Sequence, residues 1–144
     1  MSEPTYQPPD LALVGEEHVR RYRETGGEVG YLWNGAPALL LTTTGRRSGD
    51  RHTSALIFGR DGDDYLVVAS MGGAPSHPQW YLNLSARPDA EIQVRADRIP
   101  VVARTASAEE KPRLWQIVTA VWPNYDVYQS RTERDIPVVV LTPA

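Results

Sequence analysis

The sequence predicts an α+β protein that is mainly β, with about six mostly antiparallel strands in a barrel or sheet and helices packed outside it. Short apolar segments of strand length recur from residue 36 to the C-terminus. Turn residues such as Asp61-Gly62-Asp63-Asp64 separate consecutive segments, as in β-hairpins. Helical signals occur near the start, in the middle and near the end of the chain. Together these observations favour a sheet that helices cover.

The N-terminal part of the chain predicts an arm followed by a helix. Residues 1–9 are polar and contain three prolines, which is typical of a flexible or surface-lying arm. We expect residues 10–144 to form one domain, because a chain of 144 residues has the usual length of a single domain. Asp10 can cap a helix over residues 11–24, whose apolar positions have helical spacing. Gly26-Gly27 would end that helix.

The strands are expected from short apolar or alternating segments bounded by turn residues. The segment 38–44 is apolar and ends in three threonines, as in a buried strand. Residues 90–95 alternate apolar and polar side chains, as in a half-exposed strand. The full set of expected strands is 38–44, 53–59, 65–70, 90–95, 99–104 and 136–142.

Two more helices are expected between these strands. A short one begins at Pro78 and continues through Leu84, because proline suits the first turn of a helix. Ser107 and Glu110 have the spacing of a capping box, and apolar residues at helical spacing follow up to Pro123. A tyrosine-rich segment over residues 124–134 then leads to the last strand.

Composition and charge exclude several classes of function. The net charge of −3 argues against a nucleic-acid partner. The chain has no cysteine, and its three histidines are scattered, so no metal site is predicted. No signal peptide or apolar stretch of about 20 residues is visible, and the N-terminal arm is not apolar. We therefore expect a cytoplasmic protein with no strong membrane signal.

The loop after the first strand is the leading candidate for a binding site. In Gly45-Arg46-Arg47-Ser48-Gly49-Asp50-Arg51, the glycines allow backbone N–H groups to converge on an anion. The arginines supply forked donors that match phosphate oxygens, and Thr44 and Ser48 can add hydroxyl groups. These features predict an anionic, phosphate-bearing ligand. A solvated basic hairpin loop is the alternative.

Two further segments could form the rest of a site. In Ser70 to Tyr81, a strand end passes through Gly72-Gly73 to a helix start, where backbone can approach a flat ring. Its alternative is a connecting loop with Trp80 in the core. Tyr125 and Tyr128 lie three residues apart, on one face if the segment is helical, and could line an apolar substrate or donate a proton. Ordinary amphipathic packing is their alternative.

These segments, in this order, resemble the deazaflavin-dependent nitroreductase family. The likeness runs from about Val19 to the C-terminus. The segments that carry it are Leu39 to Gly49, Asp61-Gly62-Asp63, Val68-Ala69-Ser70, Gly72-Gly73, Trp80 to Leu84, Tyr125 to Gln129, and Ile136 to Val139. The resemblance implies a split β-barrel of the flavin-reductase type that binds coenzyme F420, an 8-hydroxy-5-deazaflavin with a phosphate and an oligoglutamate tail.

The resemblance also implies roles for residues. Arg46, Arg47 and Ser48 would hold the phosphate, and Arg51 could reach it or the glutamate tail. The candidate cofactor-binding residues are Thr42, Thr44, Gly45, Arg46, Arg47, Ser48, Gly49, Arg51, Val68, Ala69, Ser70, Met71, Gly72, Gln79, Trp80 and Tyr81. The candidate catalytic residues are Tyr125 and Tyr128, which would face the substrate or donate a proton, and Ser70.

The expected function is hydride transfer from reduced F420 to a quinone, a nitroaromatic compound or a similar small electrophile. The alternatives are an FMN-binding split-barrel reductase and a non-catalytic F420 carrier or sequestering protein. A monomer and a homodimer are both compatible with the sequence. His52, Ala55 and Ile57 depart from the family pattern, which usually has arginine, proline and often an aromatic residue there. The choice of substrate therefore does not follow from the resemblance.

Overall fold

A single antiparallel sheet organises the part of the chain that the computed structural model describes, which is Tyr6, residues 8–10 and residues 13–144. Its strands are β1 (Leu32–Trp33), β2 (Ala36–Thr44), β3 (Arg51–Ile57), β4 (Gly59–Asp61), β5 (Asp64–Val68), β6 (Asp89–Val94), β7 (Asp97–Thr105) and β8 (Val138–Pro143). The helices are α1 (Gly15–Thr25), α2 (Gln79–Ala86), α3 (Lys111–Val121) and α4 (Asn124–Ser130), with a 3-10 turn η1 (Met71–Gly73) before α2.

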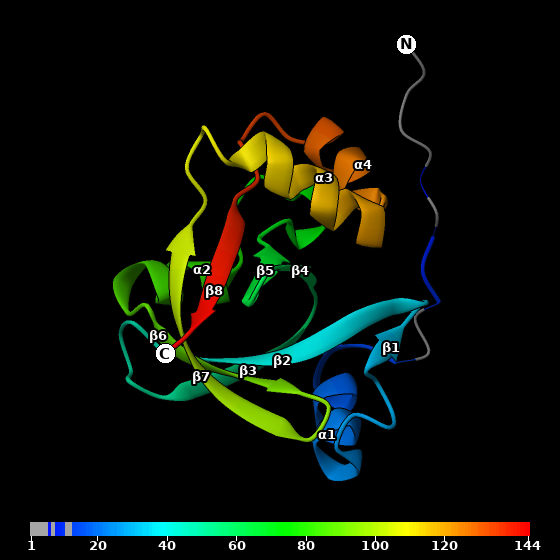
Figure 1. Ribbon diagram of the computed structural model, residues 1–144, viewed down its shortest axis with the longest axis vertical. Helices are drawn as coiled ribbons and strands as arrows, with labels where there is room; N and C mark the ends of the chain where they lie inside the picture. The colour runs from blue at the N-terminus through cyan, green and yellow to red at the C-terminus, as the bar shows by residue number, and fades with distance from the viewer. Residues whose placement is uncertain (1–5, 7, 11–12) are drawn as a thin grey trace.

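The sheet curls into a half-barrel (Figure 1). Its main path runs β1-β2-β6-β7-β8-β5-β4, and β3 pairs with β2 off that path. The β2–β3 hairpin is long, with Ala38 opposite Ile57 and Thr44 opposite Arg51. Every pairing is antiparallel among the described strands. The predicted mainly β architecture is therefore confirmed.

The central strands bury both of their faces. In β5, Tyr65 and Val67 join the cluster inside the half-barrel, whereas Leu66 and Val68 join the cluster under α3 and α4. Side chains alternate between the faces of a strand, so a strand between two apolar layers needs apolar residues at every position. This explains the continuous apolar run from Val138 to Leu141 in β8.

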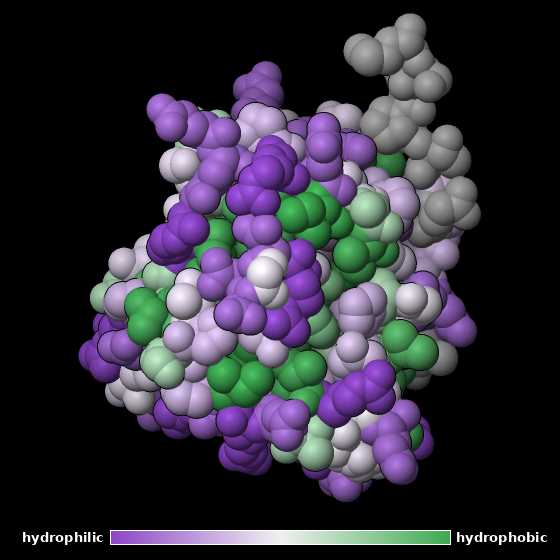
Figure 2. All heavy atoms as spheres, in the orientation of Figure 1, coloured by the Kyte–Doolittle hydropathy of each residue, from purple (hydrophilic) through white to green (hydrophobic). Residues whose placement is uncertain are grey.

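Helices cover the outside of the sheet (Figure 1). Helices α3 and α4 pack over the cluster that contains Leu66 and Val68, and α1 packs against β3. The buried Tyr22 fixes α1 to the sheet, because its hydroxyl lies 3.0 Å from the Ala38 carbonyl oxygen and accepts a bond from the backbone N–H of Arg95 at 2.8 Å. On the face that Figure 2 shows, apolar side chains reach the surface in small groups separated by polar ones.

Several predicted elements differ in detail. The first helix begins at Gly15, and Val14 rather than Asp10 is its N-cap residue. Asp10 instead donates its backbone N–H to Asn34 Oδ1 at 2.7 Å, so the predicted cap is wrong. Residues 11 and 12 of the predicted helix, and residues 1–5 and 7 of the predicted arm, lie outside the described residues. The arm and the 10–144 domain boundary stay predictions.

The sheet also has more strands than the six expected. The predicted strand 53–59 is divided into β3 and β4 at Phe58, and the two-residue β1 carries no local signal of its own. The tyrosine-rich segment contains the short helix α4, which places Tyr125 and Tyr128 one turn apart. Both hydrogen bonds of the predicted capping box are present. The Ser107 backbone N–H donates to Glu110 Oε1 at 2.9 Å, and the Glu110 N–H donates to Ser107 Oγ at 3.3 Å.

Candidate functional site

Two cavities share part of their walls. One has a volume of about 370 Å³ and is bounded mainly by apolar and aromatic side chains. The other has a volume of about 330 Å³ and is bounded by the basic loop and α2. Ser54 and Trp80 belong to the walls of both. The two cavities therefore meet at these residues and can accept different parts of one ligand.

The basic loop connects β2 to β3 and closes on itself. The Gly45 N–H donates to the Asp50 carbonyl at 2.7 Å, and the Gly49 N–H donates to the Gly45 carbonyl at 2.9 Å. A Cβ atom at Gly45 would lie 2.7 Å from Ser48 Oγ, so the loop tolerates only glycine there without a shift. Gly49 has φ +78°, in the left-handed region that glycine favours. Both glycines are thus needed for the shape of the loop.

The Arg46 side chain is held by neutral oxygens of α2. Its backbone N–H and one guanidinium nitrogen donate to Asn83 Oδ1, at 3.2 and 2.9 Å, and a second nitrogen donates to Gln79 Oε1 at 3.0 Å. In the described part of the chain, no ion pair involves Arg46, Arg47 or Arg51. Positive charge without a carboxylate partner, beside a cavity, favours an anionic ligand.

A strained segment follows β5 and lines the cavity bounded by apolar and aromatic side chains, which we call the aromatic cavity. Met71 has φ +48°, and Gly72 and Gly73 follow with φ +65° and +85°. Left-handed backbone at a non-glycine residue is uncommon and is concentrated at functional sites. Ser70, Met71 and Gly72 all line the cavity, and Met71 is 55% exposed at its mouth. Apart from Met71, this segment therefore brings only backbone and small side chains to the cavity.

Arg134 holds the same segment through hydrogen bonds from outside the cavity. Its guanidinium donates to the carbonyl oxygens of Ser70 and Ala74, both at 2.8 Å, and to that of Ala69 at 3.2 Å. It also lies 3.1 Å from His77 Nδ1. Burial and the neighbouring Arg134 charge lower the pKa of His77, which favours the neutral imidazole. The strained segment is thus held by hydrogen bonds from outside the cavity.

Aromatic side chains form another part of the cavity wall. Tyr125 and Tyr128 from α4 pack edge to face, with ring centroids 6.1 Å apart. Trp122 donates from Nε1 to the Tyr128 hydroxyl at 3.4 Å and contacts Trp33 of β1. Burial, with a smaller contribution from Tyr128, raises the pKa of Tyr125 above its ordinary value. Tyr125 therefore stays protonated at neutral pH and can donate a hydrogen bond.

The structure brings many of the predicted residues into the two cavities. The aromatic cavity is lined by Val68, Ser70, Met71, Gly72, Trp80, Tyr125 and Tyr128, and the loop cavity by Gly45, Arg46, Arg47, Ser48, Gln79 and Trp80. Trp80 is 8% exposed, belongs to the core cluster and also lines both cavities, so its core role is confirmed and its role in binding stays a prediction.

Other predicted residues lie elsewhere. Thr42 shares a hydrogen bond of 2.8 Å with Thr53, and both line a groove beside α1 together with Arg51. Ala69 is fully buried. The Tyr81 hydroxyl lies 2.9 Å from Thr105 Oγ1, in the wall of a different pocket. Thr44 ends β2 and Gly49 lies within the basic loop, and neither residue lines either cavity.

Sequence reasoning missed several wall residues. His18 of α1 and Trp33 of β1 line the aromatic cavity, as do Ser54 to Ile57 of β3, and Asn83 and His52 line the loop cavity. Only the pairing of β2 with β3, and the packing of α1, α2 and β1 beside them, brings these residues to the site. Among the described residues, no group of three or more acidic or histidine side chains could hold a metal ion, and no helix is long and apolar enough to cross a membrane.

Comparisons with known proteins identify a family for the chain. The family model described as F420H(2)-dependent quinone reductase matches residues 14–143. An F420H(2)-dependent quinone reductase of Mycobacterium tuberculosis is 50% identical over 129 residues, which cover 87% of this chain and 87% of that protein.

Solved structures support the same fold. A structure described as an F420-H2 dependent reductase, FDR-A, matches with a TM-score of 0.68 and 37% identity, covering 73% of this chain and 93% of the other. A Listeria innocua protein described as a candidate pyridoxamine 5'-phosphate oxidase matches with a TM-score of 0.52 and 14% identity, covering 74% and 82%. This last likeness concerns the fold alone. The split-barrel prediction is therefore confirmed.

Proposed function

Because this chain belongs to the F420H(2)-dependent quinone reductase family, we propose that it is an oxidoreductase that binds reduced F420 and passes its hydride to a quinone. The observation that carries the proposal is that an aromatic cavity and a basic loop cavity lie side by side and share the wall residues Ser54 and Trp80. A ligand with a flat ring and a phosphate would occupy both. Deazaflavin F420 has both groups.

The residues fit the cofactor at each of its parts. Arg46, Arg47 and Ser48 would bind the phosphate, because Arg46 is already oriented by Asn83 and has only neutral partners. The ring would lie against Trp80 and the backbone of the Val68–Met71 segment. Arg51 lies in the groove between α1 and β3, where it could meet the glutamate tail.

The bound deazaflavin would supply a hydride from its ring. The protein would orient the acceptor and exclude water, since the cavity wall is largely apolar and aromatic. Tyr125 and Tyr128 would contact the acceptor from α4, and the Tyr125 hydroxyl would donate a hydrogen bond to an acceptor oxygen. Ser70, at the strained end of β5, would contact the ring side of the same cavity.

The remaining alternatives differ in their support. The names of the similar proteins contain F420H2 and do not support the FMN alternative. A nitroaromatic acceptor stays a second proposal for the same cavity, because such a compound is also flat and electrophilic. A carrier would need no aromatic acceptor wall, so Tyr125 and Tyr128 favour an enzyme. A cytoplasmic location and a monomer or homodimer stay predictions.

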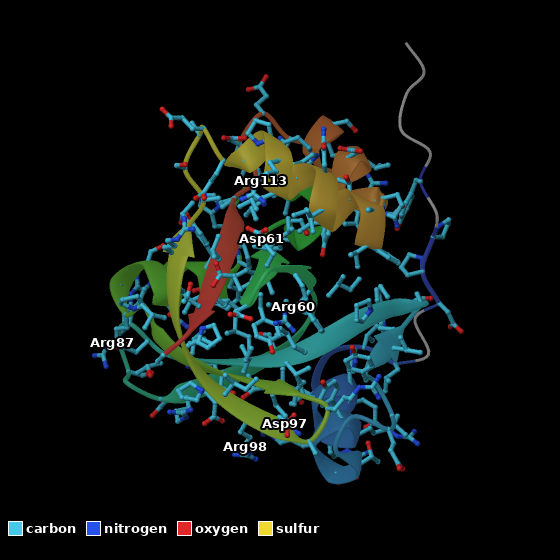
Figure 3. All side chains as sticks on the ribbon, in the orientation of Figure 1. Arg60, Asp61, Arg87, Asp97, Arg98 and Arg113 are labelled. Carbon is cyan, nitrogen blue, oxygen red and sulfur yellow. The ribbon has the colours of Figure 1, made fainter. Side chains whose placement is uncertain are left out.

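Fluorescence titration of F420 with the purified protein tests the proposal. We expect quenching or a spectral shift at micromolar cofactor. Replacing Arg46 or Arg47 with Ala should weaken binding about tenfold or more, since a hydrogen bond to a charged group contributes about 1.5–3 kcal/mol. Arg98→Ala is the control, because Arg98 lies in the β6–β7 hairpin (Figure 3) and lines neither cavity.

An acceptor screen completes the test. Reduced F420 should be oxidised by menadione in the presence of the protein. Absence of cofactor binding at tens of micromolar would contradict the proposal, and binding without oxidation by any quinone or nitroaromatic compound would favour a carrier.

A further inference from the structure

His18 occupies the wall of the aromatic cavity and has no role in the function proposed above. It lies on α1 and is 5% exposed. Its ring stacks on Trp33, with centroids 6.4 Å apart and an interplanar angle of 20°. Because Trp33 contacts Trp122, one aromatic wall continues from His18 to the tyrosines of α4.

The surroundings of His18 determine which ring nitrogen can exchange a proton. Nε2 lies 2.8 Å from the Gly30 carbonyl oxygen. A carbonyl oxygen only accepts hydrogen bonds, so Nε2 must carry a hydrogen in either protonation state. Nδ1 is therefore the nitrogen that gains or loses a proton. Residue 30 must be glycine, because a Cβ atom there would lie 2.8 Å from the Cδ2 atom of His18.

The elements around His18 bring no charged side chain to the described wall of this cavity. The titratable wall residues are His18, Tyr125 and Tyr128. On α1, Tyr22 is a ring neighbour of His18, whereas Glu17 and Arg21 are exposed. Strand β3 contributes Ser54, Ala55, Leu56 and Ile57, β2 contributes Ala38, and β1 contributes Trp33. Asp10 lies with Trp33 in the wall of a separate pocket.

Reduction of a quinone to a hydroquinone requires a proton as well as a hydride. An effective general acid gives a proton to the bound acceptor, and imidazole is the side chain that most often has this role. Tyr125 is a poor source because burial raises its pKa. We propose that His18 is the proton donor for the acceptor bound in the aromatic cavity. This inference rests on the proposed function for its substrate, a quinone.

The proposed step is a proton transfer that follows hydride transfer. A quinone that has gained a hydride is a hydroquinone monoanion with the negative charge on oxygen. The Nδ1–H bond of protonated His18 breaks, an O–H bond forms, and neutral imidazole and hydroquinone result. The imidazole regains a proton from water, and the proton lost on oxidation of the cofactor returns to the solvent. Two electrons and two protons thereby reach the quinone.

An experiment without the cofactor tests the site directly. The enolate of 2-hydroxy-1,4-naphthoquinone is flat and anionic, like the hydroquinone monoanion, and its binding can be followed by quenching of Trp33 and Trp122, which line the cavity. Binding to the wild-type protein should be about tenfold or more tighter at about pH 5.5 than at about pH 8.5, because a charged donor binds an anion more strongly. His18→Asn should abolish this pH dependence.

Turnover provides the second measurement. For quinone reduction, His18→Asn should lower kcat about 100-fold or more and remove the decline of kcat at rising pH, while the dissociation constant for F420 stays unchanged. Tyr22→Phe is the matched control, since Tyr22 is a buried ring one turn along α1 that does not line the cavity. It should lower thermal stability but keep the pH profile.

The outcomes separate this inference from the proposed function. The role of His18 is overturned if His18→Asn keeps the wild-type kcat and pH profile. It is also overturned if the wild-type protein does not bind the naphthoquinone or binds it independently of pH. Failure to bind F420 together with pH-dependent naphthoquinone binding that requires His18 contradicts the proposed function and supports the site. If His18→Asn does not fold, imidazole NMR of the wild type decides, because adding the enolate must move the His18 ring signals toward those of a protonated imidazole.

Discussion

At the scale of single residues, Asn83 determines how the basic loop presents its charge. It is 4% exposed, and its Oδ1 accepts two hydrogen bonds from Arg46, while its Nδ2 donates to Thr43 Oγ1 at 3.3 Å. A buried amide with partners on both sides has one orientation available. The guanidinium is therefore positioned before a ligand binds, which reduces the entropy lost on binding.

Asn83→Ala should weaken F420 binding about tenfold, because the loss of two hydrogen bonds frees the Arg46 side chain. Gln79→Ala removes an exposed partner of the same guanidinium and should have a smaller effect. The measurement is F420 fluorescence titration of both variants. An equal or larger loss in Gln79→Ala would contradict the role assigned to Asn83.

At the scale of elements, the turn η1 and the helix α4 are fitted together at Gly73. A Cβ atom there would lie 2.6 Å from the Tyr128 carbonyl oxygen and 3.0 Å from the Arg131 Cβ atom. Ser70 to Gly72 at the turn and Tyr125 and Tyr128 of α4 all line the aromatic cavity. This contact therefore sets how these two parts of the cavity wall are spaced.

Gly73→Ala should lower the free energy of unfolding by about 1–2 kcal/mol for the left-handed backbone and by about 1–3 kcal/mol more for overpacking against α4. It should also reduce quinone turnover, because the cavity walls must separate. Gly62→Ala is the matched control, since Gly62 has φ +60° but open space around its Cβ position. Denaturant unfolding and steady-state kinetics check both variants. Equal effects in the two variants would show that the contact with α4 is unimportant.

At the scale of the whole molecule, ion pairs link the helical layer to the sheet. Arg113 of α3 bonds Asp61 of β4 at 2.9 and 3.0 Å, and both lie between these elements in Figure 3. Glu110 pairs with Arg104 of β7. The bound arginines lower the pKa of Asp61 and of Glu110. A carboxylate whose folded pKa is lowered stabilises the fold above its unfolded pKa, and this stabilisation is lost as the pH falls through the folded value.

Thermal stability should therefore fall in two stages on acidification. The lowered pKa of His77 means that the unfolded chain binds a proton first, so stability should begin to fall below about pH 6.5. Loss of the Asp61 and Glu110 carboxylates should follow below about pH 4. Melting curves monitored by circular dichroism measure both stages. His77→Gln should remove the first stage and Asp61→Asn should weaken the second, and a melting temperature that stays constant from pH 7 to about 5 contradicts the first.

The sequence by itself determined the features that depend on neighbouring residues. The strand 38–44, the glycine-bounded basic loop, the turn at Asp61-Gly62-Asp63-Asp64 and the capping box of Ser107 and Glu110 all follow from local backbone preferences. The loop residues Arg46, Arg47 and Ser48 were predictable for the same reason, because the glycines and donors of an anion site lie within one short segment. The order of such segments also revealed the family.

Only the tertiary structure decided which of these residues share a cavity. Thr42 faces the groove beside α1, and Tyr81 faces another pocket, although both are near predicted site residues in the sequence. His18 and Asn83 reach the site through the packing of α1 and α2 against the β2–β3 region. Side chains alternate across a strand and rotate around a helix, so the face that each one presents depends on pairing between distant segments. Local patterns do not contain that pairing.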